Sequence, residues 1–218
     1  MKKLSSESAF TLIELLAVIA VIAILAAMLL PATTDRGPRG GKGIQCLSQI
    51  HQIQIGLIMF EDDHHGEFPF QIPITNGGTL EFIYGPQVFP HFQKLSAYLK
   101  QPQIFCCPLD TERTSVTNYE ALNNQAISYF LNADASTNAG KFSQMILIGD
   151  RFLQANGQPV KTGLFTVTTS LDMSWTPNMH KGLYNLGFVD GHAERTRAAN
   201  LNAYVRNQPT ATNRFCIP

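Results

Sequence analysis

The sequence predicts an α+β protein: a single N-terminal transmembrane helix, then a head in which a helix packs on a small antiparallel sheet. Three observations support this fold class. Residues 10–30 form an uninterrupted apolar run, residues 44–62 carry an apolar stripe at helical spacing, and short β-type runs come later in the chain. A helix followed by short strands with turns between them is typical of α+β folds.

The apolar run has the length and composition of a membrane span. Its twenty-one residues contain one charge, Glu14, and no Gly or Pro. At ~1.5 Å per residue the run reaches roughly 31 Å, about the thickness of the hydrocarbon core of a bilayer. A secretory signal peptide is the competing interpretation, but its apolar stretch of roughly 7–15 residues precedes a small-residue cleavage site. Here the small residue, Ala9, comes before the run.

Glu14 is the one charged residue of this run. A carboxylate inside a hydrocarbon span costs about 2.5–3.5 kcal/mol on insertion scales, so it normally has a partner and a function. No cation within the run can supply that partner. The alternative is that Glu14 snorkels to the membrane interface, because it lies close to the end of the run.

The residues Ala9-Phe10-Thr11-Leu12-Ile13-Glu14 resemble the processing motif of type IV prepilins and type II secretion pseudopilins. The resemblance implies that prepilin peptidase removes a leader, residues 1–9, between Ala9 and Phe10, and that the new amine is N-methylated. It also implies that Glu14 pairs with the amine of a neighbouring subunit when the helices of residues 10–31 assemble. The family usually has Gly at the position of Ala9, so the sequence departs from the pattern there.

Residues 32–43 contain four glycines and one proline, and we expect a flexible hinge there. The head, residues 44–218, should begin with a helix that runs to about Asp62. The resemblance places this pilin-like head on the extracytoplasmic side of a bacterial inner membrane. The apolar stripe of the helix consists of Leu47, Ile50, Ile53 or Gln54, Leu57, Ile58 and Phe60.

The remaining predicted elements are short. A helix is expected within residues 92–100, and five β-type runs follow it. These runs cover residues 126–131, 145–148, 164–169, 183–189 and 192–196.

Four cysteines, at positions 46, 106, 107 and 216, allow three disulfide pairings, among which the sequence alone does not choose. The segment from Cys46 to Asp63 resembles the helix of a pilin-like subgroup that carries a Cys at its start. That resemblance implies a bond between Cys46 and Cys107, since Cys107 precedes a proline. Cys106 would then pair with Cys216 or stay free. The spacing lacks any C-x-x-C, which weakens the case for a zinc site.

The segment from His180 to His192 resembles the "H-x9-D-G" signature of the same subgroup, with nine residues between His180 and Asp190. The structural interpretation is a β-hairpin with a two-residue Asp190-Gly191 turn of type I′, in which both residues need positive φ. The functional interpretation makes His180, Asp190 and His192 a catalytic or metal-binding constellation. Turn chemistry already explains Asp190 and Gly191, so we favour the structural interpretation.

The expected function is that of a structural subunit and not an enzyme: a pseudopilin or minor pilin of a type II secretion or type IV pilus-like system. Its partners would be prepilin peptidase, other pilin or pseudopilin subunits, and the membrane. One alternative is a membrane-anchored extracytoplasmic binding protein that does not polymerise. Another is a tethered hydrolase or metal-binding protein that uses His180 and Asp190.

Nucleic acid and cofactors are not expected as ligands. Sixteen basic and sixteen acidic residues balance, so no net field attracts nucleic acid. Some major pseudopilins bind calcium near the C-terminus, which keeps calcium as an alternative, but no matching string of ligands is evident here.

Overall fold

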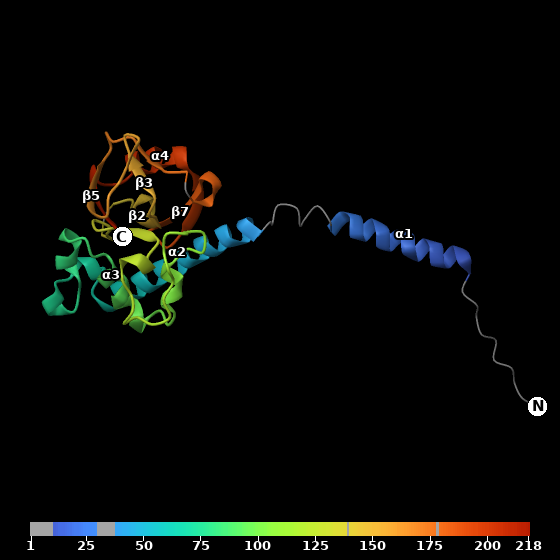
Figure 1. The fold of residues 1–218 in the computed structure, drawn as a ribbon, viewed down its shortest axis with the longest axis horizontal. Helices are drawn as coiled ribbons and strands as arrows, with labels where there is room; N and C mark the ends of the chain where they lie inside the picture. The colour runs from blue at the N-terminus through green and yellow to red at the C-terminus, as the bar shows by residue number, and fades with distance from the viewer. Residues whose placement is uncertain (1–10, 30–37, 139, 178) are drawn as a thin grey trace, which may run out of the picture. The chain divides into compact units, whose positions relative to one another are not determined.

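The computed structural model describes residues 11–29, 38–138, 140–177 and 179–218. The chain divides into two compact units, Met1–Gly41 and Lys42–Pro218. The larger unit, the head, contains all the buried hydrophobic side chains of the described residues, from Cys46 onwards. In this unit a long helix and several short ones lie beside antiparallel strands (Figure 1).

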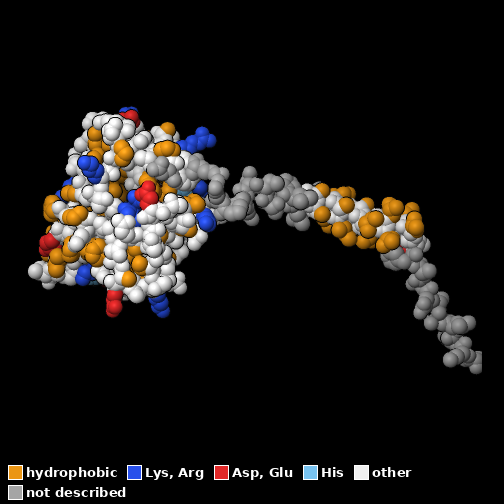
Figure 2. Space-filling model, in the orientation of Figure 1, with side chains coloured by type: hydrophobic (Ala, Val, Ile, Leu, Met, Phe, Trp, Pro, Cys, Tyr) orange, Lys and Arg blue, Asp and Glu red, His pale blue; other side chains and the backbone are white. Residues whose placement is uncertain are grey.

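Helix α1 (Leu12–Leu29) belongs to the smaller unit. Its large apolar side chains are exposed around the helix, and Figure 2 shows them along its length. Within the described ranges, no helix combines the length and hydropathy needed to cross a membrane. The ends of the predicted transmembrane segment, Phe10, Leu30 and Pro31, lie outside the described residues.

Helix α2 (Pro38–Asp63) begins six residues earlier than the sequence predicts. Residues 38–43 were expected in the hinge, and that part of the prediction is wrong. Proline fits the first turn of a helix, because its missing N–H has no partner there, and a helical glycine costs only about 0.5–1 kcal/mol relative to alanine. Gly43 also lies so close to the Arg195 guanidinium that a Cβ would overlap it. The remaining hinge residues, 32–37, lie outside the described residues.

The rest of α2 agrees with the sequence prediction. The helix ends at Asp63, one residue after the predicted end. Its apolar stripe faces the core, with Leu47 and Ile58 half-buried at the margins. The fully or almost fully buried side chains on this face are Cys46, Ile50, Ile53, Gln54, Leu57 and Phe60.

The main sheet has six strands in the order β5-β9-β1-β2-β7-β8, and every neighbouring pair is antiparallel. Five of the strands correspond to the five predicted runs, whereas the C-terminal strand β9 was not predicted. The strands are β1 (Tyr129–Asn132), β2 (Ile146–Asp150), β5 (Gly163–Thr168), β7 (Leu183–Phe188), β8 (Ala193–Arg197) and β9 (Thr212–Ile217).

A smaller sheet and short helices complete the head. Its three strands, in the order β4-β3-β6, are β3 (Leu153–Ala155), β4 (Gln158–Pro159) and β6 (Met173–Trp175). The helix expected within residues 92–100 is in fact α3 (Phe89–Gln93), continued by a 3-10 turn at Lys94–Ala97. Helix α4 (Leu201–Arg206) precedes β9. Further 3-10 turns are η2 (Pro69–Gln71), η3 (Ile74–Asn76), η4 (Leu80–Tyr84), η6 (Pro102–Phe105), η7 (Asn124–Ala126), η8 (Phe142–Gln144), η9 (His180–Gly182) and η10 (Ala198–Asn200).

A buried amide attaches α2 to the hairpin formed by β7 and β8. The Gln54 Nε2 atom donates to the carbonyl oxygens of Phe188 at 2.8 Å and His192 at 2.9 Å. The Gln54 side chain crosses Gly187 so closely that a Cβ there would lie 2.5 Å from its Cδ. Gly187 is therefore needed for this helix–sheet contact, because any larger residue would displace the amide.

The hairpin turn differs from the predicted two-residue type I′ turn. Phe188 and His192 are paired by a hydrogen bond from Phe188 N to His192 O, so three residues, 189–191, form the loop. Asp190 keeps a negative φ, and Gly191 takes φ 89°. A three-residue loop of this kind needs one residue in the left-handed region, and Gly191 supplies it. The prediction of a hairpin is confirmed, and the predicted turn type is wrong.

Substitutions in this turn separate backbone conformation from side-chain chemistry. Gly191→Val should lower the free energy of unfolding by about 1–3 kcal/mol, because a β-branched residue is strained at positive φ. Asp190→Asn should change it by less than ~0.5 kcal/mol, since the amide oxygen can still accept from His192 N, a 3.1 Å bond in this structure. Thermal unfolding of residues 42–218, with and without calcium, measures both. A larger loss for Asp190→Asn, with calcium stabilising only the parent protein, would contradict the structural interpretation.

His91 on α3 is a buried imidazole that the core keeps neutral. Its side chain is fully buried, and its Nδ1 is 2.7 Å from the Thr79 hydroxyl. Its Nε2 has no hydrogen-bond partner among the described residues. Burial disfavours the charged form and lowers the pKa of His91 to about 4.

The stability of the head should therefore fall on mild acidification. Below the ordinary histidine pKa of about 6.5, His91 binds a proton in the unfolded chain but stays neutral in the folded head. The free energy of unfolding therefore has its full value above that pH and decreases as the pH falls towards 4. The loss at pH 5 relative to pH 7 should be about 2 kcal/mol. Urea unfolding at both pH values measures it, and His91→Gln should remove this part of the pH dependence. An equal pH dependence in His91→Gln would contradict the assignment to His91.

Candidate functional site

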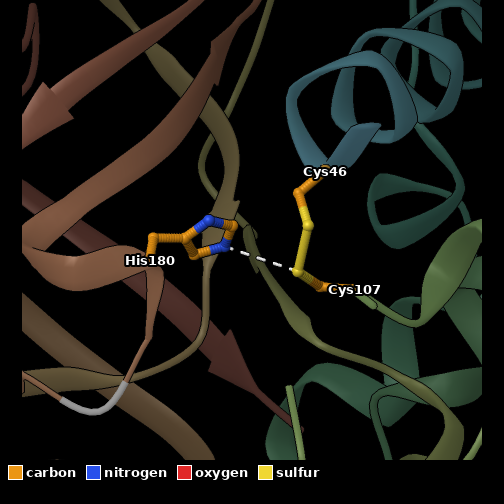
Figure 3. Close-up of side chains that lie close together, drawn as sticks. All are labelled: Cys46, Cys107 and His180. Carbon is orange, nitrogen blue, oxygen red and sulfur yellow. Dashed lines mark hydrogen bonds between the residues drawn. A yellow bond between two sulfur atoms is a disulfide. The ribbon is translucent and has the colours of Figure 1, made fainter. Parts of the chain in front are cut away.

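The chemically notable cluster of the head lies around Cys46, Cys107 and His180 (Figure 3). Cys46 comes from the buried face of α2, and Cys107 follows the 3-10 turn η6. His180 is the first residue of η9, directly before β7. One ligand-type atom from each residue lies within 4.8 Å of the other two, and all three residues are buried.

Cys46 and Cys107 form a disulfide, the pair implied by the resemblance to the pilin-like subgroup. The Cys107 backbone N–H donates to the Ser128 hydroxyl at 3.0 Å, which fixes the loop that carries this cysteine. Cys106 and Cys216 are free, buried thiols, so they do not pair with each other. Burial raises the pKa of Cys106, and it raises the pKa of Cys216 to about 12. Both thiols are therefore protonated and unreactive at neutral pH.

His180 points at the disulfide. Its Nε2 lies 3.4 Å from the Cys107 sulfur and 3.6 Å from the Asp150 Oδ2. The side chain is fully buried, and no atom of the residues that the structure describes hydrogen-bonds to its Nδ1. The backbone of His180 takes φ 54°, which is uncommon for a residue with a Cβ and places the ring towards Cys107.

Asp150 is the buried acid of the cluster, at the end of β2. Its Oδ2 accepts from the backbone N–H of Asn185 at 2.7 Å and from the Asn185 side-chain amide at 3.0 Å. Its backbone carbonyl accepts from the Trp175 indole at 2.9 Å. Its Oδ1 has no hydrogen-bond partner within the described part of the chain. Sequence reasoning missed Asp150, although a carboxylate two residues after the apolar run of residues 145–148 is an available signal.

The structure does not bring His180 and Asp190 together. His180 contacts Cys107 and Asp150, whereas Asp190 accepts a hydrogen bond from His192 in the hairpin loop. No hydrogen bond or ion pair joins His180 to Asp190, both of which are described residues. The geometry therefore gives no support to a hydrolase or metal site built from this pair. Gly191 lies at the same loop, beside Ile58 of α2.

The second candidate site is the start of α1. Thr11 and Glu14 form a reciprocal cap: Glu14 Oε2 accepts from Thr11 N at 2.8 Å and from its hydroxyl at 2.7 Å. The Glu14 backbone N–H points back to the Thr11 hydroxyl at 3.4 Å. This is the capping-box pattern, in which a Thr and a Glu three residues later satisfy the free N–H groups of a helix start. The predicted cleavage residues, Ala9 and Phe10, lie outside the described residues.

Comparison with known proteins adds evidence at the N-terminus. Neither the curated proteins nor the solved structures contain a match to the chain. A family match covers residues 4–30 and does not include the H-x9-D-G segment. The matched family is described as the prokaryotic N-terminal methylation motif, and residues 4–30 therefore carry the signature of type IV pilins and pseudopilins.

Proposed function

We propose that this protein is a structural subunit, a pseudopilin or minor pilin, of a type II secretion or type IV pilus-like system. The methylation motif at residues 4–30 is the observation that carries the proposal. Prepilin peptidase removes residues 1–9, and the new N-terminus is Phe10. Residues 10–30 hold the protein in the bacterial inner membrane, and the head lies outside the cytoplasm.

The surface of α1 supports an anchoring and assembly role. From Leu12 to Leu25 its large hydrophobic side chains are about half or more exposed. Leaving apolar surface in water is unfavourable by roughly 25 cal/mol per Å². Lipid or the same helix of neighbouring subunits would cover this surface. The disulfide between Cys46 and Cys107 also fits an extracytoplasmic head, because disulfides persist in oxidising compartments.

Glu14 can serve the helix cap and a neighbouring subunit together. Both hydrogen bonds that Thr11 donates to its side chain go to Oε2. The other carboxylate oxygen can then accept from the positive amine that cleavage creates on an adjacent subunit. Pairing with that amine would offset the cost of a carboxylate in the membrane and set the axial register of the assembly.

A membrane-anchored binding protein is the second candidate, and a cleft in the head favours it. The cleft has a volume of about 490 Å³ and is lined by Phe82, Phe89, Pro90 and Lys94 among others. That volume falls within the range of small-molecule sites, ~300–1,000 Å³. A subunit would be recovered in filaments sheared from the cell surface, whereas a binding protein that does not polymerise would stay with the membrane.

The first test of this proposal is the mature N-terminus. In a host with an active prepilin peptidase, the protein should begin at Phe10 and lack the nine leader residues, with a methyl group on its amine. Mass spectrometry of the membrane-extracted protein measures this. An intact Met1 would contradict the proposal, and a cut at the C-terminal end of the apolar run would indicate a signal peptide instead.

The second test separates the two roles of Glu14. Glu14→Gln keeps the capping box, because Gln at this position also accepts from the cap residue, but it removes the charge. Glu14→Ala removes both. If the carboxylate pairs with the amine of another subunit, both variants should insert in the membrane as well as the parent and fail to enter sheared filaments.

Incorporation of Glu14→Gln at the parent level, with loss only in Glu14→Ala, would assign Glu14 to the helix cap alone. Incorporation of both variants at the parent level would mean that Glu14 has no part in assembly. Membrane fractionation alongside the filament preparation controls for insertion.

A further inference from the structure

We propose that the cluster of Cys46, Cys107 and His180 is a zinc site in the reduced protein, and that forming the disulfide and binding zinc are alternative states of it. The proposal does not depend on the pilin-like function, because all the ligands lie in the head. Asp150 lies beside His180, outside the group of three ligand atoms that are within 4.8 Å of one another.

The distance between the donor atoms of His180 and Cys107 matches that between two ligands on one tetrahedral zinc ion. With Zn–S of about 2.3 Å and Zn–N or Zn–O of about 2.0–2.1 Å, a tetrahedron places S and N ~3.6 Å apart and N and O ~3.3 Å apart. In the structure, His180 Nε2 lies 3.4 Å from the Cys107 sulfur and 3.6 Å from Asp150 Oδ2. Cleaving the disulfide lets the Cys46 sulfur move to the ~3.8 Å separation from Cys107 that two zinc thiolates need.

The polar groups around the cluster are unusual for a site that serves packing alone. Asp150 has a fully buried carboxylate whose Oδ1 has no partner among the described residues. The Nε2 of His180 lies 3.6 Å from its Oδ2. Asn185 holds this Oδ2 in place with two hydrogen bonds, as supporting residues do around metal ligands.

The conversion between the disulfide and the zinc-bound state balances in electrons and protons. A dithiol reductant transfers two electrons and two protons to the Cys46–Cys107 bond, which gives two thiols and a cyclic disulfide of the reductant. Zinc then binds the two sulfurs as thiolates and releases their two protons. In the reverse step the two thiolates pass two electrons to a cyclic disulfide, which takes up two protons and becomes the dithiol. The S–S bond of Cys46 and Cys107 is remade and the metal leaves, because disulfide sulfurs carry no charge and are poor ligands.

Zinc fits this donor set better than calcium or magnesium. Two thiolates and an imidazole are ligands of zinc, whereas calcium and magnesium select oxygen donors. The site is closed to solvent, since the three residues are 0%, 0% and 5% exposed. The metal would therefore enter while the reduced chain folds. In either state the start of α2 is linked to the loop after η6, by a covalent bond or through a metal.

The test uses the full chain in detergent micelles. The protein is unfolded, reduced with a phosphine that does not bind zinc strongly, and refolded with equimolar zinc or cobalt(II). The reduced protein should retain one zinc per chain after desalting, and its cobalt form should show the absorption bands of tetrahedral thiolate coordination. The oxidised protein, carried through the same steps without reductant, should retain less than about a tenth as much metal.

Three variants locate the site. Cys46→Ser should abolish zinc retention, and His180→Gln should weaken zinc binding by more than ~10-fold, because it removes a ligand. Cys106→Ser is the matched control, since Cys106 is a buried free thiol next to Cys107 that is not part of the cluster. It should bind zinc as the parent does.

Several results would overturn the proposal. One is a reduced parent protein that refolds, as judged by near-UV circular dichroism, without retaining zinc. Another is a Cys46→Ser variant that retains as much zinc as Cys106→Ser. A third is a reduced parent that stays unfolded even with zinc, because metal binding to a structural site of this kind stabilises the fold.

Discussion

Helix α2 is attached to the head at two places on one face, and the hydrophobic core forms around this attachment. In its N-terminal half, Cys46 is bonded to Cys107. Two turns further on, Gln54 donates its amide hydrogens to the loop end of the β7–β8 hairpin. Between and beyond these points the apolar stripe is buried, and a single cluster of side chains joins the helix to the sheet. A sheet with one apolar face needs such a covering layer to be stable in water.

The H-x9-D-G segment is best understood through this attachment. Its histidine lies at one end of β7 and contacts the cysteine that is bonded to α2. Its Asp190-Gly191 pair lies at the other end of β7, where the hairpin loop meets Ile58 and the Gln54 amide. The segment therefore spans one strand whose two ends both serve the docking of α2. His180 and the Asp190-Gly191 pair therefore make different contacts, although their spacing in the sequence suggests a single site.

The sequence predicted elements that depend on local patterns and missed those that depend on distant partners. The stripe of α2 and the strand β7 are visible as periodic or continuous apolar runs. Strand β9 alternates poorly, because Asn213 and Arg214 interrupt it, and their partners Asn132 and Asp134 lie some eighty residues earlier. Asp150 was missed for the same reason, since its environment comes from Asn185, Trp175 and His180. The predicted turn type was wrong because the loop length is set by the pairing of Phe188 with His192 and not by the Asp-Gly dipeptide.

The position of the disulfide has a mechanical consequence. Cys46 lies four residues after the start of the head at Lys42, and its partner is 61 residues further along. Tension applied to the N-terminal segment would enter the head at Lys42 and reach Cys46 within one helical turn. The S–S bond would then transmit it directly from Cys46 to Cys107. The chain between the two cysteines would then carry little of the load. While the S–S bond lasts, that segment could not be drawn out into an extended chain, and only residues outside the bridged loop could lengthen the molecule under load.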